Sequence, residues 1–262
     1  GPEFVKLSTR DYGTGEPILL MLHGLFGSGD NWHTIARRLE ANRHIVTADL
    51  RNHGDSPHSD LFTFPAMAAD IRELLDLRGV ASADLLGHSL GGKVAMEFAL
   101  SHPEAVGHLI VVDIAPKRYR PHNIELRDAM LALDLSSIRT RRDAEDALSK
   151  RVPERSVQLF LLKNLVHEEN GGFHWRLNLE GISKSFDETG VPIARGRRFD
   201  GPVLFLYGER SNYVEPREDA PLIYELFPNA QIRSIENATH WVHADAPNEV
   251  VREIEGFLSD SE

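Results

Sequence analysis

Apolar residues along this chain form short continuous runs, separated by longer stretches with helical periodicity. Residues 17–23 (Pro-Ile-Leu-Leu-Met-Leu-His) are apolar at nearly every position, which is typical of a strand buried on both faces of a sheet. Similar runs predict strands at 44–48, 83–87, 107–112, 203–207 and 231–235, and helical patterns predict helices at 30–40 (capped by Asp30), 64–77, 90–101, 216–227 and 247–258. This alternation indicates an α/β fold, with a mostly parallel twisted sheet and helices on both faces.

The alternation stops between residues 116 and 198, where no convincing strand pattern is found. This segment contains a charged helical stretch at 139–150, an apolar stretch at 159–166 and a Gly-Gly turn at 171–172. We predict that residues 116–198 are a mostly helical insertion that forms a lid over the strand ends, while residues 5–115 and 199–262 form the core. The alternative is that the insertion simply completes the core. The first four residues, Gly-Pro-Glu-Phe, resemble a protease and cloning scar and are left out of the fold prediction.

The composition of the chain limits which binding partners and which cellular location we expect for this protein. The formal net charge of −11 argues against a nucleic-acid or anionic membrane surface, because phosphate contacts need clustered lysine and arginine. No window approaches 18 uninterrupted apolar residues, so stable membrane insertion is not expected, and the N-terminus lacks the pattern of a signal peptide. The chain has no cysteine, which excludes disulfides and thiolate catalysis and fits a cytoplasmic location. The oligomeric state cannot be predicted from these features.

The motif Gly87-His-Ser-Leu-Gly91 lies between a predicted strand and a predicted helix. This order is that of a nucleophile elbow, in which a serine occupies a sharp and strained strand-to-helix turn. Gly87 and Gly91 leave the space that such a turn requires. The turn presents the hydroxyl at the tip of the sheet, at a helix N-terminus that favours negative charge. Ser89 is therefore the candidate nucleophile, and the alternative is a glycine-rich turn without chemistry.

A serine hydroxyl needs a positioned base to become nucleophilic. Of the 13 histidines, His240 lies between the last predicted strand and the last helix, at the same edge of the sheet as Ser89. We predict His240 as the base and His243 as structural; the two lack a third partner for zinc, so no metal is expected. The oxyanion is expected to accept hydrogen bonds from the backbone N–H groups of Leu90 and Leu25. No phosphate-binding glycine motif is present, so no nucleotide cofactor is expected either.

Four motifs together resemble the α/β-hydrolase family, and the resemblance extends from Leu7 onward: residues 23–27 (His-Gly-Leu-Phe-Gly), 49–56 (Asp-Leu-Arg-Asn-His-Gly-Asp-Ser), 87–92 (Gly-His-Ser-Leu-Gly-Gly) and 239–243 (Thr-His-Trp-Val-His). They are most similar to a branch of small bacterial esterases whose mammalian relatives are mitochondrial. The resemblance implies an α/β-hydrolase fold with a helical lid after the sixth strand in the family's count, which matches residues 116–198. It also implies hydrolysis of short acyl esters, with acyl thioesters as a further option. The turn containing Asp49, His53 and Asp55 would then be structural, rather than a metal or acid site.

The acid of the expected triad is missing from its commonest position. Most α/β-hydrolases have a Gly-x-x-Asp turn after the seventh strand, but here residues 208–211 read Gly-Glu-Arg-Ser. Asp113 ends the predicted 107–112 strand, and the esterase branch takes its acid from that place. We therefore predict Asp113 as the acid and Ser211 as an assisting group. Glu209 is the alternative acid, and Asp113 could instead only cap the following turn.

The predicted substrate pocket is walled by apolar residues, which favour an apolar acyl group. Beside Leu25 and Leu90, its walls are expected to include Phe26, Tyr119, Leu159, Phe160 and Trp175. These features predict a serine esterase that acts on short-to-medium acyl esters of small molecules and needs no cofactor.

Other activities remain open. A basic stretch of Lys117, Arg118 and Arg120 could attract an anionic leaving group such as coenzyme A, although a solvated turn explains it as well. A carbon–carbon bond hydrolase or a cofactor-free perhydrolase could use the same triad. A non-catalytic ligand-binding protein of the same fold is the alternative from a different functional class. Haloalkane dehalogenases and epoxide hydrolases need an aspartate where this chain has Ser89.

Overall fold

A single sheet of seven strands organises the chain in the computed structural model, which describes residues 4–121 and 123–260. The strand order is β1-β3-β2-β4-β5-β8-β9, and every neighbouring pair is parallel except β1 and β3. The strands are β1 (Thr9–Tyr12), β2 (Ile18–Leu22), β3 (His44–Ala48), β4 (Ala83–His88), β5 (Val106–Val112), β8 (Val203–Gly208) and β9 (Ala230–Ile235). The predicted α/β fold with a mostly parallel sheet is confirmed.

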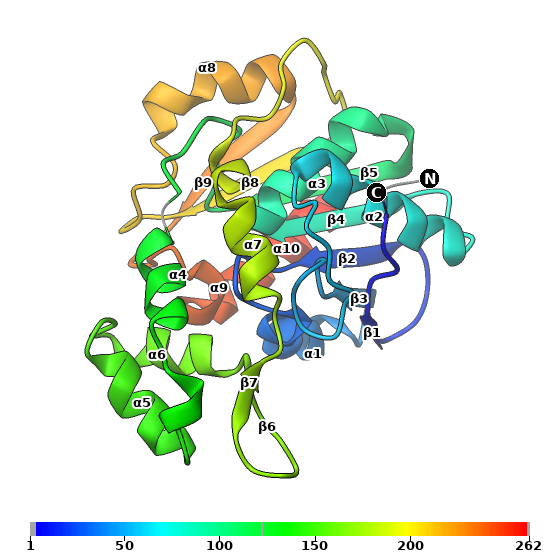
Figure 1. The fold of residues 1–262 in the computed structure, drawn as a ribbon. Helices are drawn as coiled ribbons and strands as arrows, with labels where there is room; N and C mark the ends of the chain where they lie inside the picture. Colours follow the sequence, from blue (N-terminus) through cyan, green and yellow to red (C-terminus); the bar gives the residue numbers. More distant parts are fainter. Residues whose placement is uncertain (1–3, 122, 261–262) are drawn as a thin grey trace.

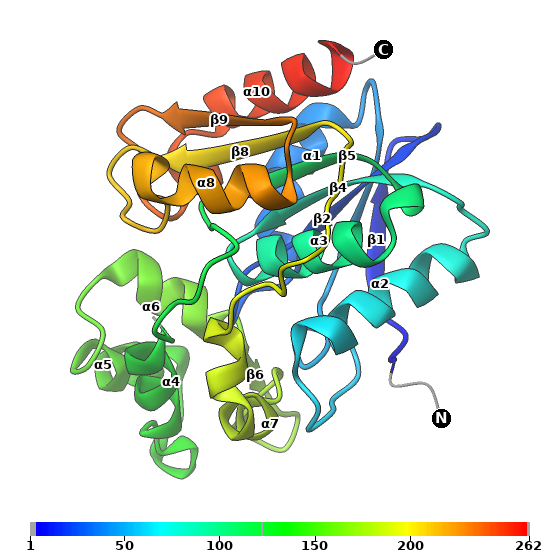
Figure 2. The ribbon, with the colours of Figure 1, turned by 90° about the horizontal axis from the view of Figure 1, so that it is seen from above.

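Helices cover both faces of this sheet (Figures 1 and 2). On one face lie α1 (His33–Leu39) and α10 (Pro247–Asp260), and on the other lie α2 (Phe64–Leu77), α3 (Leu90–Ser101) and α8 (Pro216–Leu226). Strand β2 shows why its sequence is apolar throughout. Leu19 and Met21 belong to the core under α1 and α10, whereas Leu20 belongs to the core under α2 and α3. Alternate side chains therefore fill two separate cores.

Two features at the N-terminal side differ from the sequence prediction. Strand β1 was not predicted, because three of its four residues are exposed at the edge of the sheet and give no apolar run. Helix α1 begins at His33, not at Asp30, because residues Gly29–Trp32 form a 3₁₀ turn. The capping side chain of that turn is Ser28, whose hydroxyl accepts the N–H of Asp30 at 3.3 Å, so the prediction of Asp30 as the cap was wrong.

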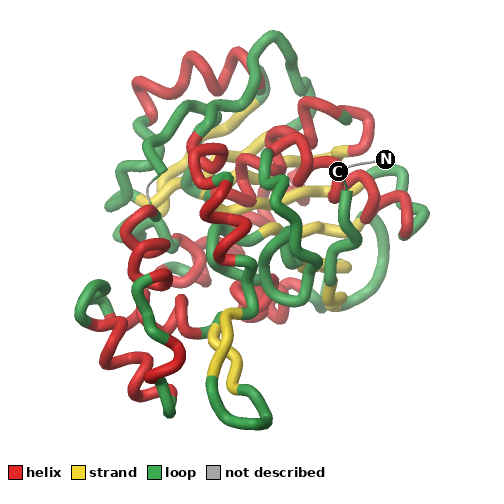
Figure 3. Tube along the Cα trace, viewed as in Figure 1, coloured by secondary structure: helices red, strands yellow, loops and turns green. Residues whose placement is uncertain are grey.

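The insertion (residues 116–198) follows β5, which is the fifth strand of this chain in sequence order. Its helices are α4 (Ile124–Leu131), α5 (Arg141–Ser149), α6 (Arg155–Leu162) and α7 (Leu179–Lys184), with short 3₁₀ turns at Leu135–Ser137 and Phe186–Gly190. The insertion also contains a hairpin of β6 (Leu165–His167) and β7 (Phe173–Trp175), visible in Figure 3, so the expectation of no strand there was wrong. Strands of three residues are too short to produce a recognisable pattern. None of the helices described in residues 4–121 and 123–260 is long and apolar enough to span a membrane.

Candidate active site

Ser89 is the single residue that connects β4, which ends at His88, to α3, which begins at Leu90. Its φ of 55° is in the left-handed region, which is strained for any residue with a side chain. The flanking glycines make the turn possible. A Cβ atom on Gly87 would lie 2.1 Å from the carbonyl oxygen of Gly91, and one on Gly91 would lie 2.4 Å from that of His23. The turn has the geometry of a nucleophile elbow.

The ring of His240 lies between Ser89 and Asp113. Its Nε2 is 3.0 Å from Oγ of Ser89, and its Nδ1 is 2.6 Å from Oδ2 of Asp113. A carboxylate at Nδ1 holds the proton on that nitrogen and leaves Nε2 free to accept one from the serine. His240 precedes the short helix α9 (Val242–Asp245), in the loop that follows β9. The structure therefore brings together three residues that come from three separate loops of the sheet.

Asp113 is fully buried and accepts hydrogen bonds from more than His240. The N–H of Gly208 donates to Oδ1 at 2.9 Å, and the hydroxyl of Ser211 donates to Oδ2 at 2.6 Å. Glu209 is exposed, and its N–H donates to the carbonyl oxygen of Ile235. The structure thus brings Asp113, rather than Glu209, to the histidine, with Ser211 bonded to the acid.

Tyr213 packs against His240, a contact that no sequence motif indicates. The two rings are stacked at an angle of 13°, with centroids 3.7 Å apart. Burial raises the pKa of the Tyr213 phenol, so the stacked ring stays neutral at physiological pH. The hydroxyl of Tyr119 donates to the carbonyl oxygen of Tyr213 at 2.5 Å, which holds the residue in place. An aromatic residue two positions after Ser211 was the only signal available in the sequence.

Four other histidines are buried near this site. Burial lowers the pKa of His23 and His243 to about 4, that of His53 to about 3, and that of His88 well below its usual value. They are therefore neutral at physiological pH. The ring of His243 stacks on Trp32 with centroids 4.1 Å apart, which agrees with a structural role.

Polar side chains of the turn at residues 49–56 accept hydrogen bonds from backbone N–H groups. The carboxylate of Asp49 accepts the N–H of Gly29 at 2.7 Å and that of Asp55 at 3.0 Å. Nε2 of His53 accepts the N–H of Phe26 at 3.1 Å. This turn supports the neighbouring loop. Within residues 4–121 and 123–260, no group of three or more histidine or acidic side chains could hold a metal ion.

A cavity of about 40 Å³ lies beside Ser89. Its lining includes both predicted oxyanion residues, Leu25 and Leu90. Leu90 is the first residue of α3, where the backbone N–H has no carbonyl one turn before it to bond with. The remaining lining residues are Lys93, Ile114, Tyr119, Arg120, Pro121, Asn123, Thr189 and Tyr213.

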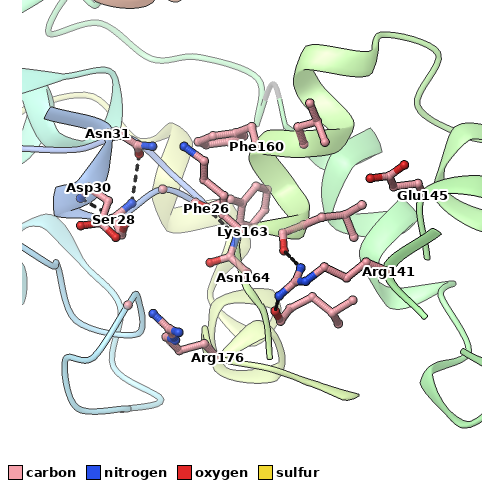
Figure 4. Close-up of a pocket in the computed structure, with 15 residues that line it drawn as sticks. Phe26, Ser28, Asp30, Asn31, Arg141, Glu145, Phe160, Lys163, Asn164 and Arg176 are labelled. Atoms are coloured by element: carbon pink, nitrogen blue, oxygen red, sulfur yellow. Dashed lines mark hydrogen bonds between the residues drawn. The ribbon is translucent and has the colours of Figure 1, made fainter. Parts of the chain in front are cut away.

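Only Tyr119, of the five residues predicted for the pocket walls, lines this cavity. Phe26, Leu159 and Phe160 line a separate pocket of about 610 Å³ between α6 and the loop after β2 (Figure 4). Trp175, in the hairpin strand β7, lines neither of these two cavities. The prediction of these four residues as walls beside Ser89 was wrong, because an apolar side chain in the loop after β2 or in the insertion carries no sequence signal for which cavity it lines. Lys93 and Thr189, which do line the cavity, were missed because neither belongs to a recognisable motif.

The sequence profile described as the alpha/beta hydrolase fold matches residues 17–150. The chain is 43% identical to "sn-1-specific diacylglycerol lipase ABHD11" of Danio rerio, over 92% of this chain and 78% of that protein. It is 36% identical to "Esterase YbfF" of Escherichia coli (strain K12), over 93% of each. A solved structure titled "Marine microorganism esterase" superposes with a TM-score of 0.94 at 37% identity, covering 97% of this chain and 99% of that one.

Proposed function

Because the chain belongs to the α/β-hydrolase fold family, we propose that it is a serine esterase that hydrolyses short-to-medium acyl esters through an acyl-enzyme on Ser89. The names of its relatives support carboxylic ester hydrolysis as the reaction class. The observation that carries the proposed mechanism is the position of the His240 ring, within hydrogen-bond distance of both Ser89 Oγ and the Asp113 carboxylate.

In the acylation step, Oγ of Ser89 attacks the ester carbonyl carbon while Nε2 of His240 takes the hydroxyl proton. The carbonyl oxygen becomes an oxyanion and accepts hydrogen bonds from the N–H groups of Leu25 and Leu90. His240 then gives the proton to the leaving oxygen, the ester C–O bond breaks, and the alcohol departs. Asp113 keeps the imidazole in the required orientation and stabilises the imidazolium.

In the deacylation step, a water molecule replaces the alcohol. His240 takes one proton from this water, and the hydroxide attacks the acyl-enzyme carbonyl carbon. The second tetrahedral intermediate collapses as His240 returns the proton to Oγ of Ser89. The carboxylic acid leaves, and the serine hydroxyl is restored.

The cavity beside Ser89 supports a small acyl group, because its volume is only about 40 Å³. Its walls include Tyr119 and Thr189, so the insertion acts in this proposal as a lid that closes the acyl side of the site. Arg120 also lines the cavity and is largely exposed. Its guanidinium is 4.0 Å from the carboxylate of Glu125, and its exposure leaves it accessible to an anionic leaving group outside the cavity, so acyl-CoA thioesters are a second candidate substrate class.

The experiment that tests the proposed function is labelling with a fluorophosphonate probe, combined with hydrolysis of p-nitrophenyl butyrate. We expect wild type to be labelled and active, and Ser89→Ala to be unlabelled and reduced in kcat by on the order of 10⁴-fold or more. Ser149→Ala, in the exposed end of α5, is the matched control and should behave as wild type. Labelling of Ser89→Ala at the wild-type rate would refute the proposal. Labelling at Ser89 without hydrolysis of esters or thioesters would instead favour a carbon–carbon bond hydrolase or perhydrolase.

A further inference from the structure

Lys93 is a buried lysine one helical turn after Ser89. Only 1% of its surface is exposed, and its side chain lines the same cavity as the serine. A buried ammonium group is costly unless polar atoms surround it. The contacts of this side chain therefore indicate what the lysine does.

Nζ of Lys93 contacts both ends of the insertion. It donates to the carbonyl oxygen of Lys117 at 2.6 Å and to that of Val191 at 2.7 Å. Lys117 belongs to the segment through which the chain enters the insertion (residues 116–121, the first stem), and Val191 to the segment through which it leaves (residues 189–193, the second stem). The ammonium also lies 5.1 Å from the centre of the Tyr119 ring, in the first stem. One side chain of α3 thus forms hydrogen bonds with two segments that are far apart in the sequence.

The two stems are also bonded directly to each other. The N–H of Tyr119 donates to the carbonyl oxygen of Gly190 at 2.8 Å, and the N–H of Ile193 donates to that of Pro116 at 2.9 Å. A Cβ atom on Gly190 would lie 2.2 Å from the carbonyl oxygen of Tyr119. The stems are therefore in close backbone contact, and Lys93 holds the pair against α3.

These stems supply a large part of the cavity wall beside Ser89. Tyr119, Arg120 and Pro121 come from the first stem, and Thr189 comes from the second. Any movement of the stems away from α3 would therefore enlarge the cavity of about 40 Å³. At its present size the cavity admits only a small group.

We propose that Lys93 is a specificity-determining residue, which limits the acyl group beside Ser89 to a few carbons by fastening both stems of the insertion to α3. This inference rests on the proposed esterase function. Burial, together with the nearby Arg118 and Lys117, lowers the pKa of Lys93 to about 7. A neutral amine still has two N–H groups, one for each carbonyl oxygen. Lys93 can therefore keep its hydrogen bonds to both stems whether it is charged or neutral.

The test is a series of p-nitrophenyl esters from acetate to octanoate, with kcat/KM measured for each. We expect wild type to prefer the short esters, and Lys93→Met to raise the octanoate-to-acetate ratio of kcat/KM by at least about tenfold. Lys150→Met, at the exposed C-terminal end of α5, is the matched control and should keep the wild-type ratio. A purely structural role would lower all values together and leave the ratio unchanged.

Gly190→Ala keeps the test decisive if Lys93→Met fails to fold. The added methyl group pushes the stems apart while Lys93 stays intact, so the ratio should rise in the same direction. An active wild type together with unchanged ratios in the folded variants would overturn the role of Lys93 alone. A wild type that hydrolyses none of the esters and is not labelled at Ser89 would overturn the proposed function. The proposed role of Lys93 in limiting the length of the acyl chain would then fall as well.

Discussion

Asp113 and His240 are 127 positions apart in the sequence, yet Oδ2 of the aspartate lies 2.6 Å from Nδ1 of the histidine. Asp113 follows β5, and His240 follows β9 across the intervening β8. The carboxyl ends of parallel strands meet at one edge of a sheet, so loops after separate strands can build one site. Asp113 itself has a φ of 55°, a strained conformation that tertiary contacts maintain.

This contact predicts which carboxylate supports the base. Asp113→Asn should lower kcat for ester hydrolysis by on the order of 10⁴-fold, because an amide at Nδ1 neither stabilises the imidazolium nor selects the required tautomer. Glu209→Gln removes an exposed carboxylate and should change kcat less than about twofold. Measuring kcat of the two variants by steady-state kinetics shows which carboxylate supports His240. A large loss in Glu209→Gln with little loss in Asp113→Asn would reverse the assignment.

Tyr213 should contribute to turnover through its stack on His240. A neutral aromatic face beside an imidazolium contributes about 0.5–2 kcal/mol, so Tyr213→Leu should lower kcat by about 2- to 30-fold. Tyr213→Phe keeps the stacked ring and should retain more activity than the leucine variant. Equal activity of the two variants, measured with p-nitrophenyl acetate, would show that the ring itself does not matter.

Lys93 should make stability rise with pH above neutrality. Its pKa is about 7 in the folded chain against 10.5 ordinarily, so between these values the unfolded chain binds the extra proton. The free energy of unfolding should therefore increase by up to about 1.4 kcal/mol per pH unit from pH 7 towards 10.5. Below pH 7 the lysine is protonated in both states, so the full destabilisation caused by burying its charge should be present there. Urea unfolding of wild type and Lys93→Met at several pH values measures this. Parallel pH profiles for the two proteins would contradict it.

The buried histidines should make the protein sensitive to acid. The pKa of His243 falls from 6.5 to about 4 on burial, so the unfolded chain takes up a proton below pH 6.5 that the folded chain does not. Stability should be lost as pH falls from 6.5 towards 4. His243→Phe keeps a ring against Trp32 and should reduce this loss by up to about 1.4 kcal/mol per pH unit. Thermal unfolding with the same acid slope in both proteins would show that His243 titrates normally.

Prediction of structure from the sequence succeeds best where the signal is local. The apolar runs of β2, β4, β5 and β8 reflect strands buried on both faces, and the glycines around Ser89 reflect a turn with no room for side chains. It failed where the local signal is weak. The exposed edge strand β1 and the three-residue strands β6 and β7 have too few buried positions to produce a pattern.

By itself, the sequence determined the order of the elements, the elbow at Ser89 and a short set of candidate partners for it, because these features depend on residues close together in the chain. Only the tertiary structure decided that Asp113, rather than Glu209, reaches His240, and that Lys93, rather than Leu159 or Trp175, lines the cavity beside Ser89. Such contacts depend on how strands and stems pack in three dimensions, and residues distant in the sequence carry no local pattern that records that packing.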